Sequence, residues 1–176
     1  CLAIAEITLR PVGTFHTGLY DNSAAEIPTY CQETERVFVV NAESGRVDVF
    51  GLDDDGSLTK AGSIDAAGEL AHGMGAVNSV SVSGGTLAVA VEAGVRTDTG
   101  RVAFYDTESL NLKGSVEAGA LPDMVTFTPD GQWVLVANEG EPNEEYTIDP
   151  EGTVTVIDVR HGFDQPHTRT VTFRDW

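Results

Sequence analysis

The chain has 176 residues, enough for one domain with its own buried core. Its formal net charge of -18, from 28 acidic against 10 basic residues, argues against a nucleic-acid-binding protein or an anionic-membrane binder, because both need a basic face. No apolar run approaches the roughly 20 residues of a membrane span. The two cysteines, Cys1 and Cys31, belong to no Cys/His cluster, which disfavours a zinc site. Abundant Val, Thr and Gly are typical of β structure.

The first predicted element is a single outer strand over residues 9–17, LRPVGTFHT. Its Gly-Thr-Phe core resembles two later segments, Gly62-Ser63-Ile64 and Gly114-Ser115-Val116, each of which closes a group of strands. The strand precedes every group to which it could belong. Many propellers close their ring by letting an opening outer strand complete the last blade, and we expect the same role here.

Three units follow, at 24–65, 76–117 and 121–175, each with four predicted strands in the same order. The first strand opens at Glu26, Asn78 or Asp123. The second is strongly apolar and covers 36–41, 87–92 or 133–138; the third follows a glycine and covers 45–50, 100–105 or 152–157. The fourth is polar. Gly-Gly at 84–85 and Pro-Asp-Gly at 129–131 predict hairpin turns between first and second strands.

Four short strands repeating about every 50 residues predict an all-β fold, a β-propeller. We interpret the chain as about three four-stranded blades of a larger, seven-bladed ring. A β-sandwich with accidental similarity between its hairpins is the alternative. Three blades do not close a ring, which typically has four to eight. The remaining blades would therefore come from the same or another chain.

The predicted ligand site lies at one mouth of the propeller channel. Successive strands run antiparallel, so the start of each first strand and the end of each second strand meet on the same face of the disc. The residues at these positions all carry oxygen: Glu26, Asn78 and Asp123 open the first strands, and Asn41, Glu92 and Asn138 close the second strands. Such a rim suits calcium or a hydroxyl-rich ligand. The alternative is that these side chains cap strand ends.

The loop between the second and third strands lies on the same face and lengthens along the chain. The third such loop, EGEPNEEYTIDPE at 139–151, carries six acidic residues, which repel one another unless a cation or a basic partner compensates them. We predict a calcium site from Glu26, Asp123, Glu139, Glu141 and Asp149. A solvated loop without a ligand is the alternative.

Other patterns in the sequence give weaker evidence of a functional site. Asp53-Asp54-Asp55-Gly56 lacks the spacing of an EF-hand and is explained by turn chemistry. Gly73-Met74-Gly75 has no following helix and lysine to make a phosphate loop. The four histidines show no paired spacing.

Two stretches resemble a known family. AAEIPTYCQETERVFVV at 24–40, and residues 120–159 with the NEGEPN-to-DPEG segment, are similar to the bacterial choice-of-anchor I proteins, over roughly Thr8 to Val159. The resemblance implies a secreted or surface β-propeller attached to the cell envelope, longer than this chain. Some members are described as alkaline-phosphatase-like or phytase-like, but the resemblance carries no catalytic residue set. Cys1 is compatible with a lipidated mature N-terminus.

Two functions are compatible with these observations. The first is an extracytoplasmic propeller segment that binds a surface partner, with calcium stabilising it. The second is a calcium-dependent phosphoesterase that acts on a phosphorylated small molecule. A phosphatase needs basic residues to hold its phosphate, and only Arg96 and Arg101 are near the predicted rim. Their scarcity favours binding.

Overall fold

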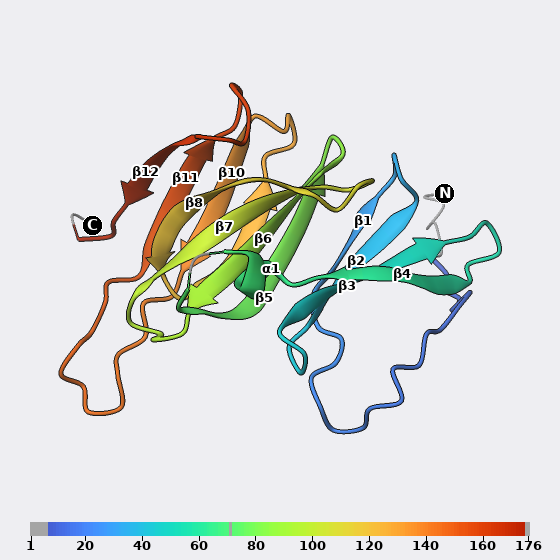
Figure 1. The fold of residues 1–176 in the computed structure, drawn as a ribbon, viewed down its shortest axis with the longest axis horizontal. Helices are drawn as coiled ribbons and strands as arrows, with labels where there is room; N and C mark the ends of the chain where they lie inside the picture. Colours follow the sequence, from blue (N-terminus) through green and yellow to red (C-terminus); the bar gives the residue numbers. More distant parts are fainter. Residues whose placement is uncertain (1–6, 71, 175–176) are drawn as a thin grey trace, which may run out of the picture.

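The computed structural model describes residues 7–70 and 72–174 and contains three four-stranded antiparallel sheets (Figure 1). Blade 1 has the strand order β1-β2-β3-β4, blade 2 the order β5-β6-β7-β8, and blade 3 the order β9-β10-β11-β12. The sheets stand side by side, and β5 packs against both β1 and β9. The first strand of each sheet thus faces its neighbours' first strands. This is the arrangement of propeller blades around an axis, and it confirms the predicted fold class.

The strands lie where the repeat predicts them, within a few residues. Blade 1 comprises β1 (Pro28–Cys31), β2 (Arg36–Asn41), β3 (Arg46–Leu52) and β4 (Leu58–Ile64). Blade 2 comprises β5 (Met74–Ser83), β6 (Thr86–Ala93), β7 (Thr99–Asp106) and β8 (Leu112–Ala120). Blade 3 comprises β9 (Pro122–Phe127), β10 (Trp133–Asn138), β11 (Thr153–Asp158) and β12 (His167–Val171). One short helix, α1 (Ala66–Glu69), connects blades 1 and 2.

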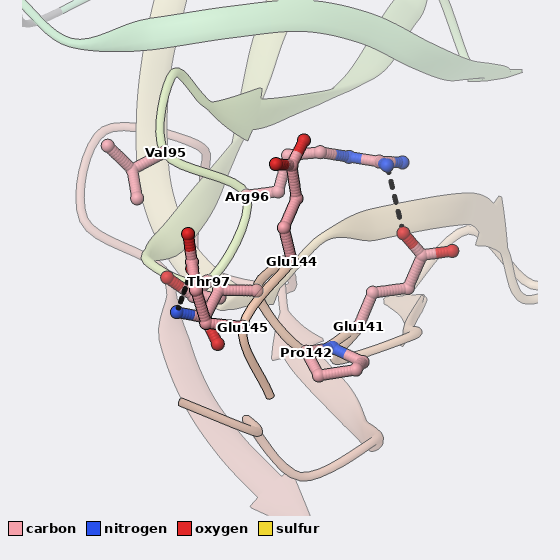
Figure 2. Close-up of a pocket in the computed structure, with 8 residues that line it drawn as sticks. Val95, Arg96, Thr97, Glu141, Pro142, Glu144 and Glu145 are labelled. Carbon is pink, nitrogen blue, oxygen red and sulfur yellow. Dashed lines mark hydrogen bonds and ion pairs between the residues drawn. The ribbon is translucent and has the colours of Figure 1, made fainter. Parts of the chain in front are cut away.

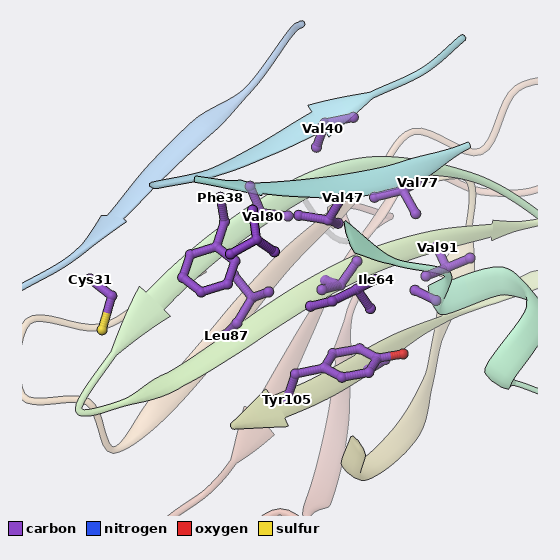
Figure 3. Packing of buried hydrophobic residues seen from close by; sticks show 14 residues of the cluster. Cys31, Phe38, Val40, Val47, Ile64, Val77, Val80, Leu87, Val91 and Tyr105 are labelled. Carbon is purple, nitrogen blue, oxygen red and sulfur yellow. The ribbon is translucent and has the colours of Figure 1, made fainter. Parts of the chain in front are cut away.

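The two middle strands of blade 2, β6 and β7, are largely buried because side chains on both of their faces are apolar. In β6, TLAVAVEA, seven of the eight residues are buried. One face of β6 carries Leu87, Val89 and Val91, which belong to the cluster between blades 1 and 2 (Figure 3). Ala88 and Ala90 on the other face belong to the cluster between blades 2 and 3. The core is therefore two apolar layers, each sandwiched between neighbouring sheets.

Side chains also join the backbones of neighbouring blades. The hydroxyl oxygens of Ser79 and Ser81 on β5 accept hydrogen bonds from the amides of Val125 and Phe127 on β9, at 3.2 and 3.3 Å. Arg36 on β2 donates from Nη1 to the carbonyl oxygens of Thr107 and Glu108 in the β7–β8 turn. These polar contacts fix the relative positions of the blades beyond what apolar packing specifies.

The expected strand over residues 9–17 is not a strand in this structure. The segment has no regular secondary structure and lies against blade 1, where the rings of Phe15 and Phe50 have centroids 4.6 Å apart. A strand needs a neighbouring strand to satisfy its amide and carbonyl groups, and each of the three described sheets already holds four strands. The segment is therefore docked but unpaired.

Candidate functional site at the acidic face

The strand registers bring the predicted rim positions together within each blade. In blade 2 the register shifts between Val77 and Ser79, opposite Val91 and Ala90 on β6, and the Asn78 side chain there reaches Glu92. In blade 3 Pro122 pairs with Asn138. In blade 1 the amide of Glu26 donates to the carbonyl oxygen of Val40 at 3.0 Å. The starts of the first strands and the ends of the second strands therefore lie on one face, as the antiparallel order requires.

Two of the six rim residues turn into the protein. Asn41 is 7% exposed. Its side-chain nitrogen donates to Asp48, and its side-chain oxygen accepts from the backbone amide of Ser44. Asn138 is 3% exposed and donates to the hydroxyl oxygens of Thr153 and Thr155. Such engagement favours the capping interpretation for both asparagines.

Asn78 and Glu92 form part of a polar chain that crosses from blade 2 to blade 3. The Asn78 amide nitrogen donates to Oε2 of Glu92 at 3.3 Å and to the carbonyl oxygen of Pro122 at 3.1 Å. Arg96 lies 3.7 Å from Glu92 and forms a 2.9 Å ion pair with Glu141 of the β10–β11 loop. These contacts join the first strands and the loops of the two blades on one face.

The remaining predicted residues are exposed and do not form a cluster with one another. Glu26 and Asp123 open their strands at the surface, and Glu139 and Asp149 lie at the surface of the β10–β11 loop. Over residues 7–70 and 72–174, no three His, Cys, Asp or Glu side chains come close enough together to hold a metal ion. The five-residue calcium set stays a prediction.

The acidic β10–β11 loop has a defined shape. The side-chain oxygen of Asn143 accepts from the amides of Thr147 and Ile148, both at 2.9 Å, and its nitrogen donates to the Thr147 hydroxyl. At the base of the loop, a Cβ on Gly140 would lie 2.6 Å from the carbonyl oxygen of Pro150, so the two ends approach too closely for a side chain. The loop is thus held by its own polar contacts as well as by the ion pair with Arg96.

Between this loop and the β6–β7 loop lies a groove of about 330 Å3, which we call the loop groove (Figure 2). Its lining comprises Val95, Arg96, Thr97, Glu141, Pro142, Asn143, Glu144 and Glu145. Arg96 is already paired with Glu141, which leaves the carboxylates of Glu144 and Glu145 as excess negative charge. The groove therefore favours a ligand that brings positive charge or hydrogen-bond donors.

Sequence reasoning missed the contacts that build this groove. From its position the sequence predicts Arg96 only as a phosphate-binding residue, whereas in the structure it connects two loops through ion pairs. The carbonyl of Pro122 is a backbone partner that no side-chain pattern reveals. Arg101, the second basic candidate, donates to the hydroxyl of Ser115 on β8 and does not line the groove. The sequence does place an arginine in the β6–β7 loop and several acidic residues in the β10–β11 loop on the same face. This pairing of opposite charges is the signal that predicts a contact between the two loops.

The Asp53–Gly56 turn is held by local hydrogen bonds. Asp55 accepts from the amide of Ser57 at 2.9 Å and Asp53 accepts from its hydroxyl. No helix within residues 7–70 and 72–174 is long and apolar enough to cross a membrane.

The repeat, the three blades and the acidic loop lead to one family. Residues 26–176 match the model of the choice-of-anchor I domain. The chain belongs to the choice-of-anchor I domain family. No curated protein sequence matches it.

Solved structures with the same arrangement of blades are distant in sequence. A luciferin-regenerating enzyme superposes with a TM-score of 0.62 at 17% identity, covering 82% of this chain and 48% of that one. A periplasmic gluconolactonase of Pseudomonas aeruginosa gives a TM-score of 0.58 at 20% identity, covering 86% of this chain and 43% of that one. This choice-of-anchor I chain thus spans less than half the length of either propeller, and the likeness concerns the fold alone.

Proposed function

We propose that this choice-of-anchor I chain is part of an extracytoplasmic, cell-envelope β-propeller that binds a ligand in the loop groove, with calcium stabilising the folded chain. The carrying observation is that the longest loop of the acidic face has a defined shape, held by the hydrogen bonds of Asn143 with Thr147 and Ile148, and contacts the neighbouring blade through the 2.9 Å ion pair between Arg96 and Glu141. A fixed loop offers a preorganised surface, which reduces the entropy lost on binding. Family membership supports a cell-surface or secreted location.

The charge of the loop groove supports a cationic or calcium-bridged ligand over a phosphate. The side chains of Glu144 and Glu145 are exposed and line the groove, whereas the guanidinium of Arg96 is 58% exposed and committed to Glu141. Carboxylate oxygens are the ligands that calcium prefers. A phosphate entering this groove would meet more negative than positive charge. Binding is therefore favoured over phosphoester hydrolysis.

The calcium part of the proposal is tested by thermal denaturation at increasing calcium concentration. A cation bound only to the folded chain stabilises it by about 2.7 kcal/mol at 100 times its dissociation constant, which raises the melting temperature by several degrees. The double variant Glu144→Gln/Glu145→Gln removes two carboxylates of the groove and is expected to abolish this rise. The matched control, Asp54→Asn/Asp55→Asn, removes the same charge from the β3–β4 turn and is expected to keep it. If the melting temperature of the parent chain is unchanged at millimolar calcium, the calcium part of the proposal is refuted.

The role as a binding protein is tested against catalysis. The chain is incubated with a phosphomonoester and with phytate, in calcium and in chelator, and released phosphate is measured. We expect no calcium-dependent release. Turnover that disappears in Glu26→Ala or Asp123→Ala would establish the phosphoesterase instead, because these carboxylates open first strands on the same face.

A further inference from the structure

Three large apolar side chains are exposed beside the loop groove, and we call them the apolar border. They are Val95 of the β6–β7 loop, 60% exposed, and Tyr146 and Ile148 of the β10–β11 loop, 80% and 55% exposed. Val95 lines the groove together with Glu145, which directly precedes Tyr146 (Figure 2). The carbonyl oxygen of Ile148 accepts from the amide of Asn143, another lining residue, at 2.9 Å. The apolar border and the groove therefore form one surface.

The backbone holds Tyr146 in a conformation that disfavours a large side chain. Its φ is 54°, in the left-handed region, where Cβ crowds the backbone. The amide of Tyr146 donates to the carbonyl oxygen of Asn143 at 3.0 Å, which closes a turn. Glycine or asparagine would satisfy such a turn at lower cost. The exposed aromatic ring is therefore better explained by contact with another molecule than by the needs of the loop.

The closing of a propeller ring does not account for this surface. Blades 1, 2 and 3 pack on one another through the faces of their sheets. The β10–β11 loop instead extends beyond the ends of its strands, at the lower left of Figure 1. A further blade added in the same way contacts a sheet face, so ring closure by itself does not require the exposed ring of Tyr146.

The charge around the apolar border indicates what binds there. Residues 139–151 of the β10–β11 loop include six acidic and no basic residues. Arg96 pairs with Glu141 at 2.9 Å, and Arg174 pairs with Glu151 at 2.8 Å. Within the described part of the chain, no ion pair reaches the other four carboxylates, which belong to Glu139, Glu144, Glu145 and Asp149. A partner with complementary charge therefore carries lysine or arginine.

We propose that the loop groove and the apolar border dock a basic segment of a partner protein, in which lysine or arginine residues alternate with apolar ones. This rests on the proposed ligand site and goes further by naming the ligand as a polypeptide. Its basic side chains reach Glu144 and Glu145, and its apolar side chains cover Tyr146 and Ile148. Exposed tyrosines are among the residues that carry most of the binding energy when a partner buries them.

Arg96 shows that the carboxylates of this face accept a guanidinium. Its side chain lies 2.9 Å from Glu141 and 3.7 Å from Glu92. An arginine of the partner would meet Glu144 and Glu145 in the same way. Two other occupants fit less well. A lone cation makes no use of three exposed apolar side chains, and a second copy of this chain brings the same acidic loop and a net charge of -18.

Fluorescence anisotropy with labelled heptapeptides tests the proposal, in chelator so that no calcium occupies the carboxylates. The probes are Lys-Leu-Lys-Tyr-Lys-Leu-Lys and Lys-Ser-Lys-Ser-Lys-Ser-Lys, which carry the same charge. We expect the full chain to bind the apolar probe about tenfold more tightly than the polar probe. Binding of both probes should weaken in the variant Glu144→Gln/Glu145→Gln and at high salt, because charge attraction contributes to both.

Substitution of the apolar border tests where the apolar probe binds. Tyr146→Asn/Ile148→Thr removes two exposed apolar side chains, and asparagine suits the left-handed backbone at position 146. This variant should bind the two probes with nearly equal affinity. The matched control, Leu9→Thr/Tyr20→Asn, removes apolar side chains that are 91% and 93% exposed in the N-terminal segment, and it should keep the preference. Circular dichroism checks that both variants are folded.

Several results would overturn the proposal. They are equal affinity of the parent chain for the two probes, no binding of either, a preference that persists in Tyr146→Asn/Ile148→Thr, and a preference that is lost in the control. Displacement of the apolar probe by maltoheptaose at equal concentration would assign the surface to a carbohydrate and would also overturn it. The calcium titration is decided separately, because it follows melting without peptide. A calcium-dependent melting shift without peptide binding would retain the proposed function and reject only the polypeptide ligand.

Discussion

Asn138 offers the sharpest test of whether a rim residue serves the fold or a ligand. Its side-chain oxygen accepts from the amide of Gly119 on β8 at 3.0 Å, and its nitrogen donates to Thr153 at 3.0 Å and Thr155 at 2.9 Å. Asn138 and Thr155 are buried, at 3% and 2% exposure. The side chain therefore joins blade 2 to blade 3 where water has little access.

We expect Asn138→Ala to lower the free energy of unfolding by about 2–4 kcal/mol. Each of the three bonds contributes about 1 kcal/mol net, and the buried Thr155 hydroxyl loses its partner without gaining water. For a chain of this size, that loss corresponds to a fall of roughly 5–15 °C in melting temperature. Urea denaturation followed by circular dichroism measures it, with a lower midpoint and an unchanged m-value.

Asn78→Ala is the matched control, because Asn78 makes two partly exposed hydrogen bonds at the same face. Its cost is expected to stay below about 1.5 kcal/mol, since water replaces the lost partners. A cost below about 1 kcal/mol for Asn138→Ala would refute the reasoning. That result would return Asn138 to the set of candidate ligand residues.

Two further predictions concern single side chains. The side-chain hydrogen bond from Arg160 holds the pKa of Asp158 at about 2, below the usual 3.8, so the folded state gains stability above about pH 4 and loses it as the pH falls towards 2. Because Arg160 lies over the Trp133 ring at 4.6 Å, Trp133 fluorescence in a Trp176→Phe background should change over that range, and the change should be absent in Asp158→Asn. Burial, with the carboxylate of Glu69 nearby, raises the pKa of Tyr105. Among the described residues the Tyr105 hydroxyl has no partner within ordinary hydrogen-bond geometry, so Tyr105→Phe should stabilise the chain by up to about 1 kcal/mol in urea denaturation. Destabilisation by that amount would show that Glu69 accepts a hydrogen bond from this hydroxyl.

The sequence repeat predicted the blades because their strands have local signals. Glycines such as Gly45, Gly100 and Gly152 stand just before or at the start of third strands, and the apolar runs that precede them became β2, β6 and β10. These strands are buried on one face in β2 and β10 and on both faces in β6, so their apolar composition is informative. The strand predicted at 9–17 is absent because a strand must hydrogen-bond to a neighbouring strand. A local sequence pattern does not show whether such a neighbour is present.

The candidate site was only partly predictable. The antiparallel order places Glu26, Asn78 and Glu92 on one face, and the registers agree with that. Whether a rim side chain points inward depends on what the next blade offers: Asn138 turns toward a backbone amide of Gly119, which lies in a different sheet. The ion pair between Arg96 and Glu141 depends likewise on the path of two loops, which sequence spacing does not specify.

The serine hydroxyls of β5 have a consequence for how the chain comes apart. Ser79 and Ser81 supply acceptors to β9 amides, so blade 3 cannot separate from blade 2 without breaking the hydrogen bonds to the amides of Val125 and Phe127. The two blades are therefore expected to exchange their core amides with solvent as one cooperative unit. A protease that cleaves only the locally unfolded chain is therefore expected to reach both blades in the same unfolding event.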